Sequence, residues 1–356
     1  MAYKSPLHEM SETTPTQFWN DNCSPEDIAY AMSHGAVGAT TNPVIVGQVL
    51  SKDLNKYAPL IKQLVTNNPT ATEDEIAWLL NEHMALEGAK QLQPVFEQTG
   101  GKAGYISIQT NTKYFNNAQK TTEQAIHFSK LAKNMMVKMP ATKAGIQAVE
   151  ESTYHGVNVN ATVSFSVPQA IAVAEAIERG MERRKKEGLD NSHLHPVCTI
   201  MIGRVDDWLK EIQEKENIIV DPHAINMSGI AVFKNAHKIY QEKGYHTRLL
   251  AAAYRHHHHW SELIGADMIH TIPANWLKRF AESKITIKNR MANDIDPGLL
   301  AQLQDNFADF NKAYNANGMT HDEFDTFGAT VRTLNQFLDG YDKMVTIVRS
   351  FMVYNK

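Results

Sequence analysis

The stretch NMMVKMPATKAG, residues 134–145, places one lysine, Lys138, inside a run that otherwise predicts a buried strand. Burial of an ammonium group disfavours its charged form and lowers its pKa. A lysine that is partly neutral near pH 7 has the reactivity that Schiff-base chemistry requires. The simpler alternative is structural: Lys138 reaches water at the strand end or pairs with a carboxylate. Taken alone, the stretch favours that structural interpretation of Lys138. A catalytic role requires support from the remaining sequence.

Eight short apolar runs, the Lys138 stretch among them, alternate with segments of helical spacing. These runs are TQFWND (16–21), AVGATTNP (36–43), GYISIQ (104–109), NMMVKMP (134–140), GVNVNAT (156–162), HPVCTIMI (195–202), RLLAAAY (248–254) and ADMIHTIP (266–273). Eightfold alternation of strand and helix predicts a closed parallel (β/α)8 barrel, or TIM barrel, which takes about 250 residues. We expect the barrel over residues 16–276 of this α/β protein, after an irregular polar arm over residues 1–15.

Two segments exceed the needs of a minimal barrel. Residues 44–104 separate the second and third runs and predict an extra helix there, started by Thr72 and the acidic residues that follow it. Residues 277–356 predict C-terminal helices packed on the barrel, with Thr320 and Glu323 spaced as a capping box. Beyond this box, apolar residues recur at helical spacing, at Phe324, Phe327, Val331, Leu334, Leu338, Tyr341, Val345 and Val348. This pattern predicts a helix against the barrel wall or a neighbouring subunit.

The bulk composition excludes several classes of function. The chain is 43% hydrophobic and 21% charged with a net charge of -4, which predicts neither nucleic-acid binding nor attraction to an acidic membrane surface. We find no signal-peptide pattern and no apolar stretch long enough to cross a membrane. Two cysteines, Cys23 and Cys198, are too few for a disulfide framework or a zinc site. We therefore expect a cytoplasmic protein.

Four consecutive histidines, His256–His259, suggest a metal site at first sight. Adjacent positions on a helix point in different directions, so the four side chains cannot all bind one ion. We therefore expect a solvated or partly packed face here and no metal.

Polar residues stand at the ends of the predicted strands, where the active sites of such barrels lie. They are Asp21, Asn42, Gln109, Lys138, Asn160, Thr162, the segment 199–204 and Arg255. The set contains one amine nucleophile, one carboxylate for proton transfer, neutral groups suited to a polyol and two arginines suited to an anion. Because Lys138 belongs to this set of strand-end residues, we interpret it as catalytic and not as structural.

Some members of this set also fit structural roles. Asn42 precedes Pro43 and could serve only as a turn residue before a helix. The amide of Asn160 could be satisfied by neighbouring strands instead of a substrate. Arg204 could equally form a surface ion pair with Asp206 or Asp207.

Six blocks, together with WND (19–21), resemble the transaldolase family of class I aldolases. In chain order they are GATTNPVIV (38–46), VKMPATKAG (137–145), VNVNATVSFSVPQA (157–170), IGRVDDW (202–208), AAAYR (251–255) and IGADMIHTIP (264–273). The blocks follow the order of the family, and together they are specific, although each alone is weak. The resemblance does not cover the first 15 residues, and no motif covers the last 80.

The resemblance implies a role for each matched residue. Lys138 would form the Schiff base with a sugar phosphate, and Asp21 would act as the acid/base. The remaining matches are Asn42 and Asn160 for the dihydroxyacetone hydroxyls, Thr162 for the catalytic water, and Arg204 and Arg255 for the phosphate; Thr199 and Met201 complete the expected substrate pocket. A small sugar phosphate is the implied partner, no cofactor or metal is implied, and a homo-oligomer is compatible with the family.

Three residues depart from the family pattern. Gln109 stands where transaldolases carry a glutamate, and glutamine cannot transfer a proton. The small fructose 6-phosphate aldolases of this family also have glutamine there, combined with a tyrosine three residues before the arginine. This chain has Met201 at that position, which is neither that tyrosine nor the phenylalanine of transaldolases. Ala253 replaces a serine that helps to bind phosphate. These departures bear on water activation and on the affinity for the anion.

The sequence therefore supports three hypotheses. The first is transfer of a dihydroxyacetone unit between sugar phosphates or close analogues. Gln109 favours the second, a fructose 6-phosphate aldolase-like cleavage that releases free dihydroxyacetone. In the third, the departures are read as decay, and the barrel binds sugar phosphates without catalysis.

Overall fold

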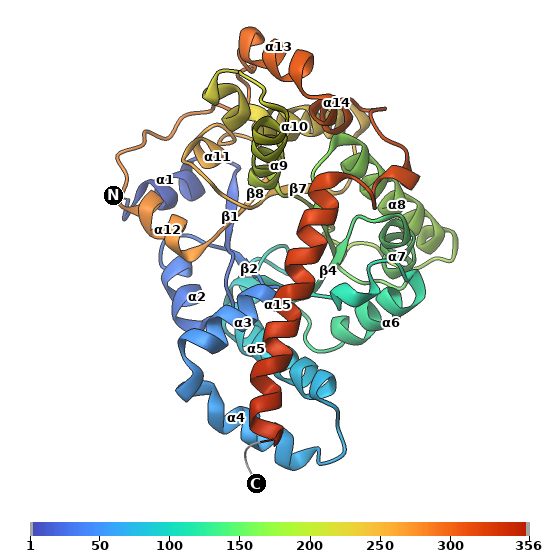
Figure 1. Ribbon diagram of the computed structural model, residues 1–356. Coiled ribbons are helices and arrows are strands. Elements are labelled where there is room, and N and C mark those ends of the chain that lie inside the picture. Colours follow the sequence, from blue (N-terminus) through green and yellow to red (C-terminus); the bar gives the residue numbers. More distant parts are fainter. Residues whose placement is uncertain (1–2, 354–356) are drawn as a thin grey trace.

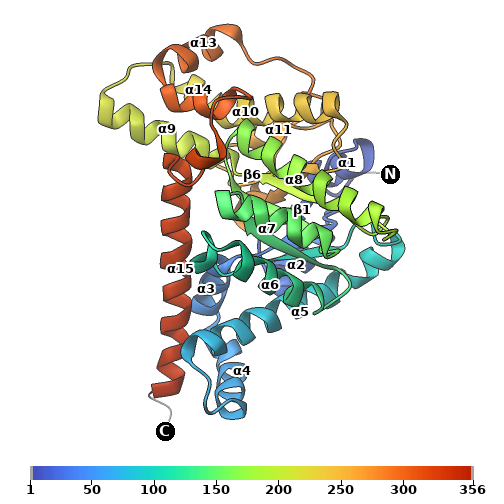
Figure 2. The same ribbon diagram turned by 90° about the vertical axis from the view of Figure 1, so that its right-hand side faces the viewer.

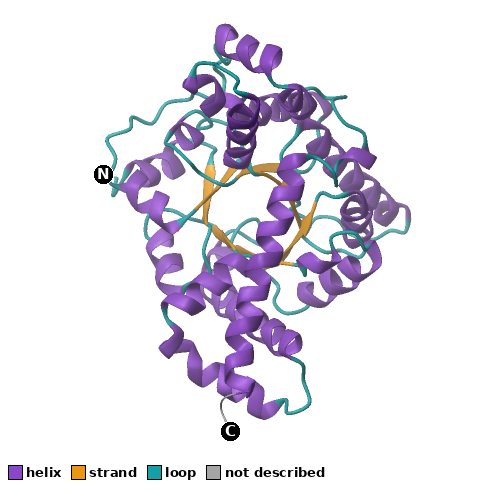
Figure 3. Ribbon diagram, viewed as in Figure 1, coloured by secondary structure: helices purple, strands orange, loops and turns teal. Residues whose placement is uncertain are grey.

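The computed structural model of the chain describes residues 3–353 and contains eight parallel strands that close into one ring (Figure 3). The strands are β1 (Gln17–Asn20), β2 (Gly38–Thr40), β3 (Tyr105–Gln109), β4 (Met135–Pro140), β5 (Val159–Ser164), β6 (Val197–Ile200), β7 (Arg248–Ala251) and β8 (Ile269–Ile272). Each strand pairs with the next, and β8 pairs with β1 over four residues. The predicted (β/α)8 barrel is confirmed, and each of the eight predicted runs contains or overlaps one strand.

Helices follow the strands and form the outer layer of the barrel (Figures 1 and 2). Those outside the crossover between β2 and β3 are α2 (Pro25–Met32), α6 (Ala118–Ser129), α7 (Lys143–Tyr154), α8 (Val167–Lys186), α9 (Ile202–Glu216), α10 (Pro222–Lys243), α11 (His258–Ser261) and α12 (Ala274–Ala281). Several begin directly after a strand, because a polar side chain such as Ser24, Thr142 or Ser166 caps the first turn. Within residues 3–353, none of the helices is long and apolar enough for a membrane crossing.

The long crossover between β2 and β3 holds three helices, α3 (Pro43–Lys52), α4 (Leu54–Asn67) and α5 (Glu73–Gln98). The predicted extra helix in this crossover is confirmed. The Thr72 side chain caps α5, and Glu75 completes the capping box by accepting the Thr72 backbone N–H at 2.7 Å. These helices pack with the C-terminal helix around a second apolar cluster beside the barrel, which includes Tyr57, Leu80 and Met344.

The C-terminal segment contains α13 (Pro297–Asn306), α14 (Ala308–Tyr314) and the long helix α15 (Gly328–Val353). Helix α15 crosses the ring of strands in Figures 1 and 3 and lies along one side of the molecule in Figure 2. It packs closely on α3, since a Cβ atom on Gly340 would lie 2.3 Å from a methyl carbon of Val44. The helix therefore covers part of the barrel mouth.

The C-terminal helices differ from the prediction in two details. The capping box of Thr320 and Glu323 is present, but it starts a short 3-10 turn, η2 (His321–Glu323), before α15 begins at Gly328. Val331 is 43% exposed, although most of the other predicted apolar positions are buried. Within α15 the buried face contains Thr330, Thr333, Leu334 and Phe337, so Val331 lies beside that face and is exposed to water.

The expectation of an irregular N-terminal arm is wrong. Residues Pro6–Thr13 form helix α1, which begins after the Ser5 cap. Leu7 and Met10 are fully buried in a cluster that includes Phe18 and Trp260. Two buried residues three apart are enough to anchor one helical face, although the surrounding sequence is polar.

Candidate active site

Strand β4 carries Lys138 in register with Gln109 of β3 and Asn160 of β5. The Lys138 side chain is only 2% exposed. Its burial lowers the pKa of the ammonium group, the nearby Asp21 carboxylate opposes this shift, and Arg204 adds to it. Lys138 is therefore more often a neutral amine than an ordinary lysine at the same pH.

Asp21 follows β1, where its backbone N–H donates to the carbonyl of Ile272 at 2.9 Å. Its carboxylate accepts a 2.6 Å hydrogen bond from the hydroxyl of Thr40, which lies 2.6 Å from the Thr271 hydroxyl. Burial raises the pKa of Asp21, although Lys138 and the Thr40 hydrogen bond oppose the shift. The pKa values of Asp21 and Lys138 thus move toward each other, which suits proton exchange at the site.

A cavity of about 400 Å³ opens at the carboxyl ends of the strands. Six of the predicted site residues line this mouth cavity: Asp21, Asn42, Lys138, Met201, Arg204 and Arg255. Asn42 caps α3 by accepting the Ile45 N–H at 3.0 Å, so its side-chain oxygen has the predicted turn role. Its NH2 group has no hydrogen-bond partner among residues 3–353, so the cap leaves this group available at the cavity.

The other four predicted residues, Gln109, Asn160, Thr162 and Thr199, are buried in the barrel interior. Asn160 donates to the Ser107 hydroxyl at 3.1 Å and accepts from the Thr199 hydroxyl at 2.7 Å. Neighbouring strands therefore satisfy much of its amide, as the structural alternative proposed. The Thr162 hydroxyl lies 3.9 Å from the Met201 sulfur, which connects it to the wall of the mouth cavity.

Gln109 occupies the position next to Lys138 in the sheet. Its NH2 group donates to Thr112 at 3.3 Å, while its oxygen is buried without a hydrogen-bond partner among residues 3–353. A buried amide oxygen without a partner favours a water or a substrate hydroxyl beside it.

Arg204 and Arg255 form the cationic side of the mouth cavity. The Arg255 guanidinium donates to both oxygens of Asp207, at 2.9 and 2.6 Å. Arg332 of α15 also reaches Asp207, at 3.3 Å. Burial, with Arg255 next in effect, lowers the pKa of Arg204 to about 10. Arg332 also pairs with Glu211 at 3.1 Å. Arg204, Arg255 and Arg332 thus lie near two carboxylates, and the one positive charge in excess favours a bound anion.

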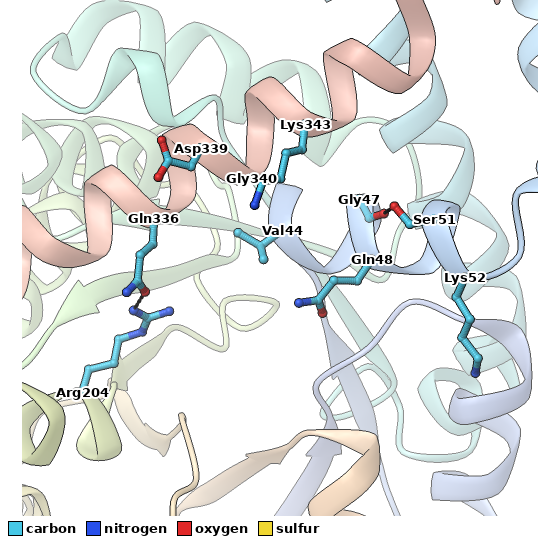
Figure 4. A pocket seen from close by; sticks show the side chains of 10 residues that line it. All are labelled: Val44, Gly47, Gln48, Ser51, Lys52, Arg204, Gln336, Asp339, Gly340 and Lys343. Carbon is cyan, nitrogen blue, oxygen red and sulfur yellow. Dashed lines mark hydrogen bonds between the residues drawn. The ribbon is translucent and has the colours of Figure 1, made fainter. Parts of the chain in front are cut away.

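The alternative ion pair of Arg204 with Asp206 or Asp207 is not formed. Arg204 instead contacts α15, through the hydroxyl of Thr333 at 3.4 Å and the side-chain oxygen of Gln336 (Figure 4). Its Nε atom is buried and has no partner in the described part of the chain. The C-terminal helix therefore holds one of the two predicted anion-binding residues.

A second hollow of about 640 Å³, the α3/α15 groove, lies between these two helices (Figure 4). The groove and the mouth cavity share Val44, Gln48 and Arg204 as lining residues. Lys52 and Lys343 add positive charge to its walls. Asp339 also lines the groove, so three cations and one carboxylate give its walls a net positive charge beside Arg204.

The four-histidine segment does not form the expected solvated or partly packed face throughout. His259 is fully buried, and both it and His256 lie within hydrogen-bond distance of the buried Asp206 carboxylate, at 2.8 and 3.2 Å. Because positions 256 and 259 are three apart across the start of α11, their side chains can meet even though those of adjacent positions cannot.

A parallel barrel with a buried lysine near a carboxylate at its strand ends has the architecture of a class I aldolase. Comparison with known sequences defines the group further: residues 18–338 match the family described as Transaldolase/Fructose-6-phosphate aldolase. The chain belongs to this family, and the predicted resemblance is confirmed.

Several relatives named transaldolase support this assignment. Transaldolase 2 of Streptomyces coelicolor is 31% identical over 207 residues, which cover 58% of this chain and 54% of the relative. The transaldolase of Neisseria gonorrhoeae is 32% identical over 204 residues, which cover 54% of this chain and 56% of the relative. The transaldolase of Neisseria meningitidis serogroup C (strain 053442) is 28% identical over 295 residues, with coverage of 75% and 81%. The chain thus spans about half the length of the first two relatives.

Sequence reasoning missed several residues around the site. Phe337 lines the mouth cavity and Gln336 holds Arg204, but no motif marks either residue within α15. Thr40 lies inside the GATTNP run as the last residue of β2, and this place at a strand end was the available signal. Asp206 and His259 could have been paired only by knowing how α9 and α11 pack.

Proposed function

We propose that this protein catalyses transaldolase-type transfer of a dihydroxyacetone unit between sugar phosphates through a Schiff base on Lys138. The observation that carries the proposal is the buried Lys138 with its lowered pKa, lining the same mouth cavity as Asp21. Within the lining of that cavity, Asp21 is the carboxylate available for proton transfer. The family assignment and the transaldolase names of the relatives support the same chemistry.

In the proposed reaction the neutral Lys138 amine attacks the ketone carbon of the donor, and loss of water gives an iminium ion. Asp21 then takes the proton from the C4 hydroxyl. The C3–C4 bond breaks, its electron pair moves through C2 to the iminium nitrogen, and an aldehyde leaves. The remaining three-carbon enamine adds to an acceptor aldehyde, and hydrolysis returns the lysine and releases the new ketose.

The other residues of the site would bind and orient the substrate. The NH2 group of Asn42 is proposed to hold a hydroxyl of the dihydroxyacetone unit, with Asn160 and Thr199 below it. Arg204 and Arg255 would bind the phosphate, supported by the positive charge gathered around Asp207. Thr162 and Gln109 would hold a water molecule, but Gln109 cannot take a proton from it.

Gln109 favours a second candidate reaction, cleavage that releases free dihydroxyacetone. Product analysis with fructose 6-phosphate, with and without an aldose phosphate acceptor, separates the two. For a transferase, turnover should depend on the acceptor and yield a new ketose phosphate. Cleavage at full rate without an acceptor would replace transfer with the aldolase reaction, whereas absence of both reactions and of any Schiff base would indicate a binding protein.

The two arginines should contribute mainly to binding of the phosphorylated substrate. We expect Arg204→Ala and Arg255→Ala each to raise the KM for fructose 6-phosphate about 10- to 100-fold, because each removes a charge-assisted hydrogen bond. The KM for the uncharged analogue D-fructose should change little in comparison. Steady-state kinetics on both sugars measures the difference, and equal effects on the two sugars would contradict the phosphate role.

A further inference from the structure

The Asp206 carboxylate is fully buried on α9 and lies within hydrogen-bond distance of four polar groups. One oxygen accepts from the hydroxyl of Ser228 at 2.9 Å and from the backbone N–H of Gly229 at 3.0 Å. The other oxygen faces the Nε2 atoms of His259 at 2.8 Å and His256 at 3.2 Å. Such complete pairing lets a charge remain buried, but it does not yet explain why a charge is needed there.

The second ring nitrogen of His259 explains why a charged carboxylate lies at Asp206. Its Nδ1 atom accepts the backbone N–H of Arg255 at 3.1 Å. A neutral imidazole carries one proton, so Nδ1 must hold the lone pair and Nε2 must hold the hydrogen that is donated to Asp206. The buried carboxylate thus fixes the His259 tautomer that can accept from Arg255.

The same geometry argues against a metal ion. The donor atoms of Asp206, His256 and His259 lie within 4.8 Å of one another, which is close enough for a metal site. A metal would need the lone pair of His259 Nε2, yet Nδ1 already uses its own lone pair to accept the Arg255 N–H. The ring would then carry no proton at all, so metal binding and the Arg255 contact exclude each other.

Arg255 is held at its other end by the neighbouring aspartate. Asp207 accepts two guanidinium hydrogen bonds and the Tyr254 carbonyl accepts a third at 3.0 Å, while Asp206 acts on the backbone through His259. The turn before Arg255 is also tight: Ala253 has a left-handed φ of 67°, and a Cβ atom on Gly203 would lie 1.8 Å from its carbonyl oxygen. Three residues at the start of α9 thus fix the segment after β7: Gly203 packs on it directly, Asp206 acts through His259, and Asp207 binds the Arg255 guanidinium.

We propose that the Asp206–His259 pair is a positioning device that fixes the Arg255 backbone and so presents its guanidinium to the substrate anion. This inference rests on the proposed function only in its choice of anion. His259 acts here as a positioning residue, because it contacts Arg255 and not the mouth cavity. The segments IGRVDDW (202–208) and RHHHH (255–259) would then together supply the two arginines and the residues that position Arg255.

A matched pair of variants tests the proposal. In His259→Asn, the amide oxygen can replace Nδ1 and still accept the Arg255 N–H, whereas His259→Gln places its amide near Asp206 and leaves that N–H without a partner. We expect His259→Gln to weaken binding of inorganic phosphate about tenfold in calorimetric titration and to raise the KM for fructose 6-phosphate similarly. The change in kcat should be smaller, and His259→Asn should remain close to the wild type.

The proposal would be overturned if the wild type, His259→Gln and His259→Asn bound phosphate with equal affinity, or if both variants lost the same amount of affinity. A stoichiometric metal in the purified wild type that both variants lack would also overturn it. Circular dichroism confirms that each variant is folded before it is titrated. Failure of the proposed function has a different signature, because phosphate titration requires no catalysis. If the wild type forms no borohydride-trapped adduct on Lys138, the proposed reaction fails while the comparison of phosphate affinities still stands.

Discussion

Replacing Lys138 with alanine should abolish covalent binding of substrate and lower kcat by more than about 10^4-fold, since no other group would form the iminium ion. The structure supports this expectation because Lys138 is buried in the mouth cavity and its pKa is lowered by that burial. Wild-type protein treated with borohydride and fructose 6-phosphate should gain the mass of a reduced three- or six-carbon adduct. Peptide mapping should place that adduct on residue 138, and Lys138→Ala should show none.

Lys143 provides the matched control for this variant. It belongs to the same stretch of sequence, but it lies on the surface at the start of α7 and forms an exposed ion pair with Asp322 at 2.5 Å. Its replacement by alanine should leave both the adduct and kcat unchanged. A borohydride adduct that persists in Lys138→Ala, or one that disappears in Lys143→Ala, would show that the nucleophile has been assigned to the wrong lysine.

The periodic part of the fold was predictable from sequence, and so were the charged residues that line the mouth cavity, although most of the remaining wall was not. Each strand of a parallel barrel is buried on both faces, so each appears as a short apolar run, and strand ends such as Asp21, Asn42 and Lys138 follow from those runs. The sequence around Lys138 alone did not distinguish a catalytic from a structural lysine. The catalytic prediction depended on the polar residues at the ends of the other strands.

The contacts made by the helices were not predictable in the same way. Helix α15 has a clear apolar face, but its sequence does not show that Gln336 and Thr333 would reach Arg204 at the barrel mouth. Helical spacing fixes which residues share a face, whereas the surface that covers this face depends on packing between distant segments. The same limit applies to α1, whose two buried residues were hidden in a polar segment, and to the contact between Asp206 and His259.

Replacing Asp21 with asparagine should separate Schiff-base formation from carbon–carbon bond cleavage. Asparagine keeps the shape of the side chain but cannot accept the C4 hydroxyl proton, so kcat should fall about 10²- to 10⁴-fold. The Lys138 amine remains, and borohydride should still trap an adduct with the intact ketose. Rapid-quench analysis should detect this six-carbon adduct in Asp21→Asn and a mixture with the three-carbon adduct in the wild type. A variant that cleaves the ketose at the wild-type rate would exclude Asp21 as the base.

The same variant also makes a prediction about pH. The Asp21 carboxylate raises the pKa of Lys138, in opposition to burial, because it stabilises the ammonium form. Removing that charge should lower the pKa of Lys138 further, so a larger fraction of the amine is neutral at any given pH. The pH midpoint of the initial rate of borohydride-trapped adduct formation should therefore move to lower pH in Asp21→Asn. An unchanged or higher midpoint would contradict the stabilisation of the Lys138 ammonium form by the Asp21 carboxylate.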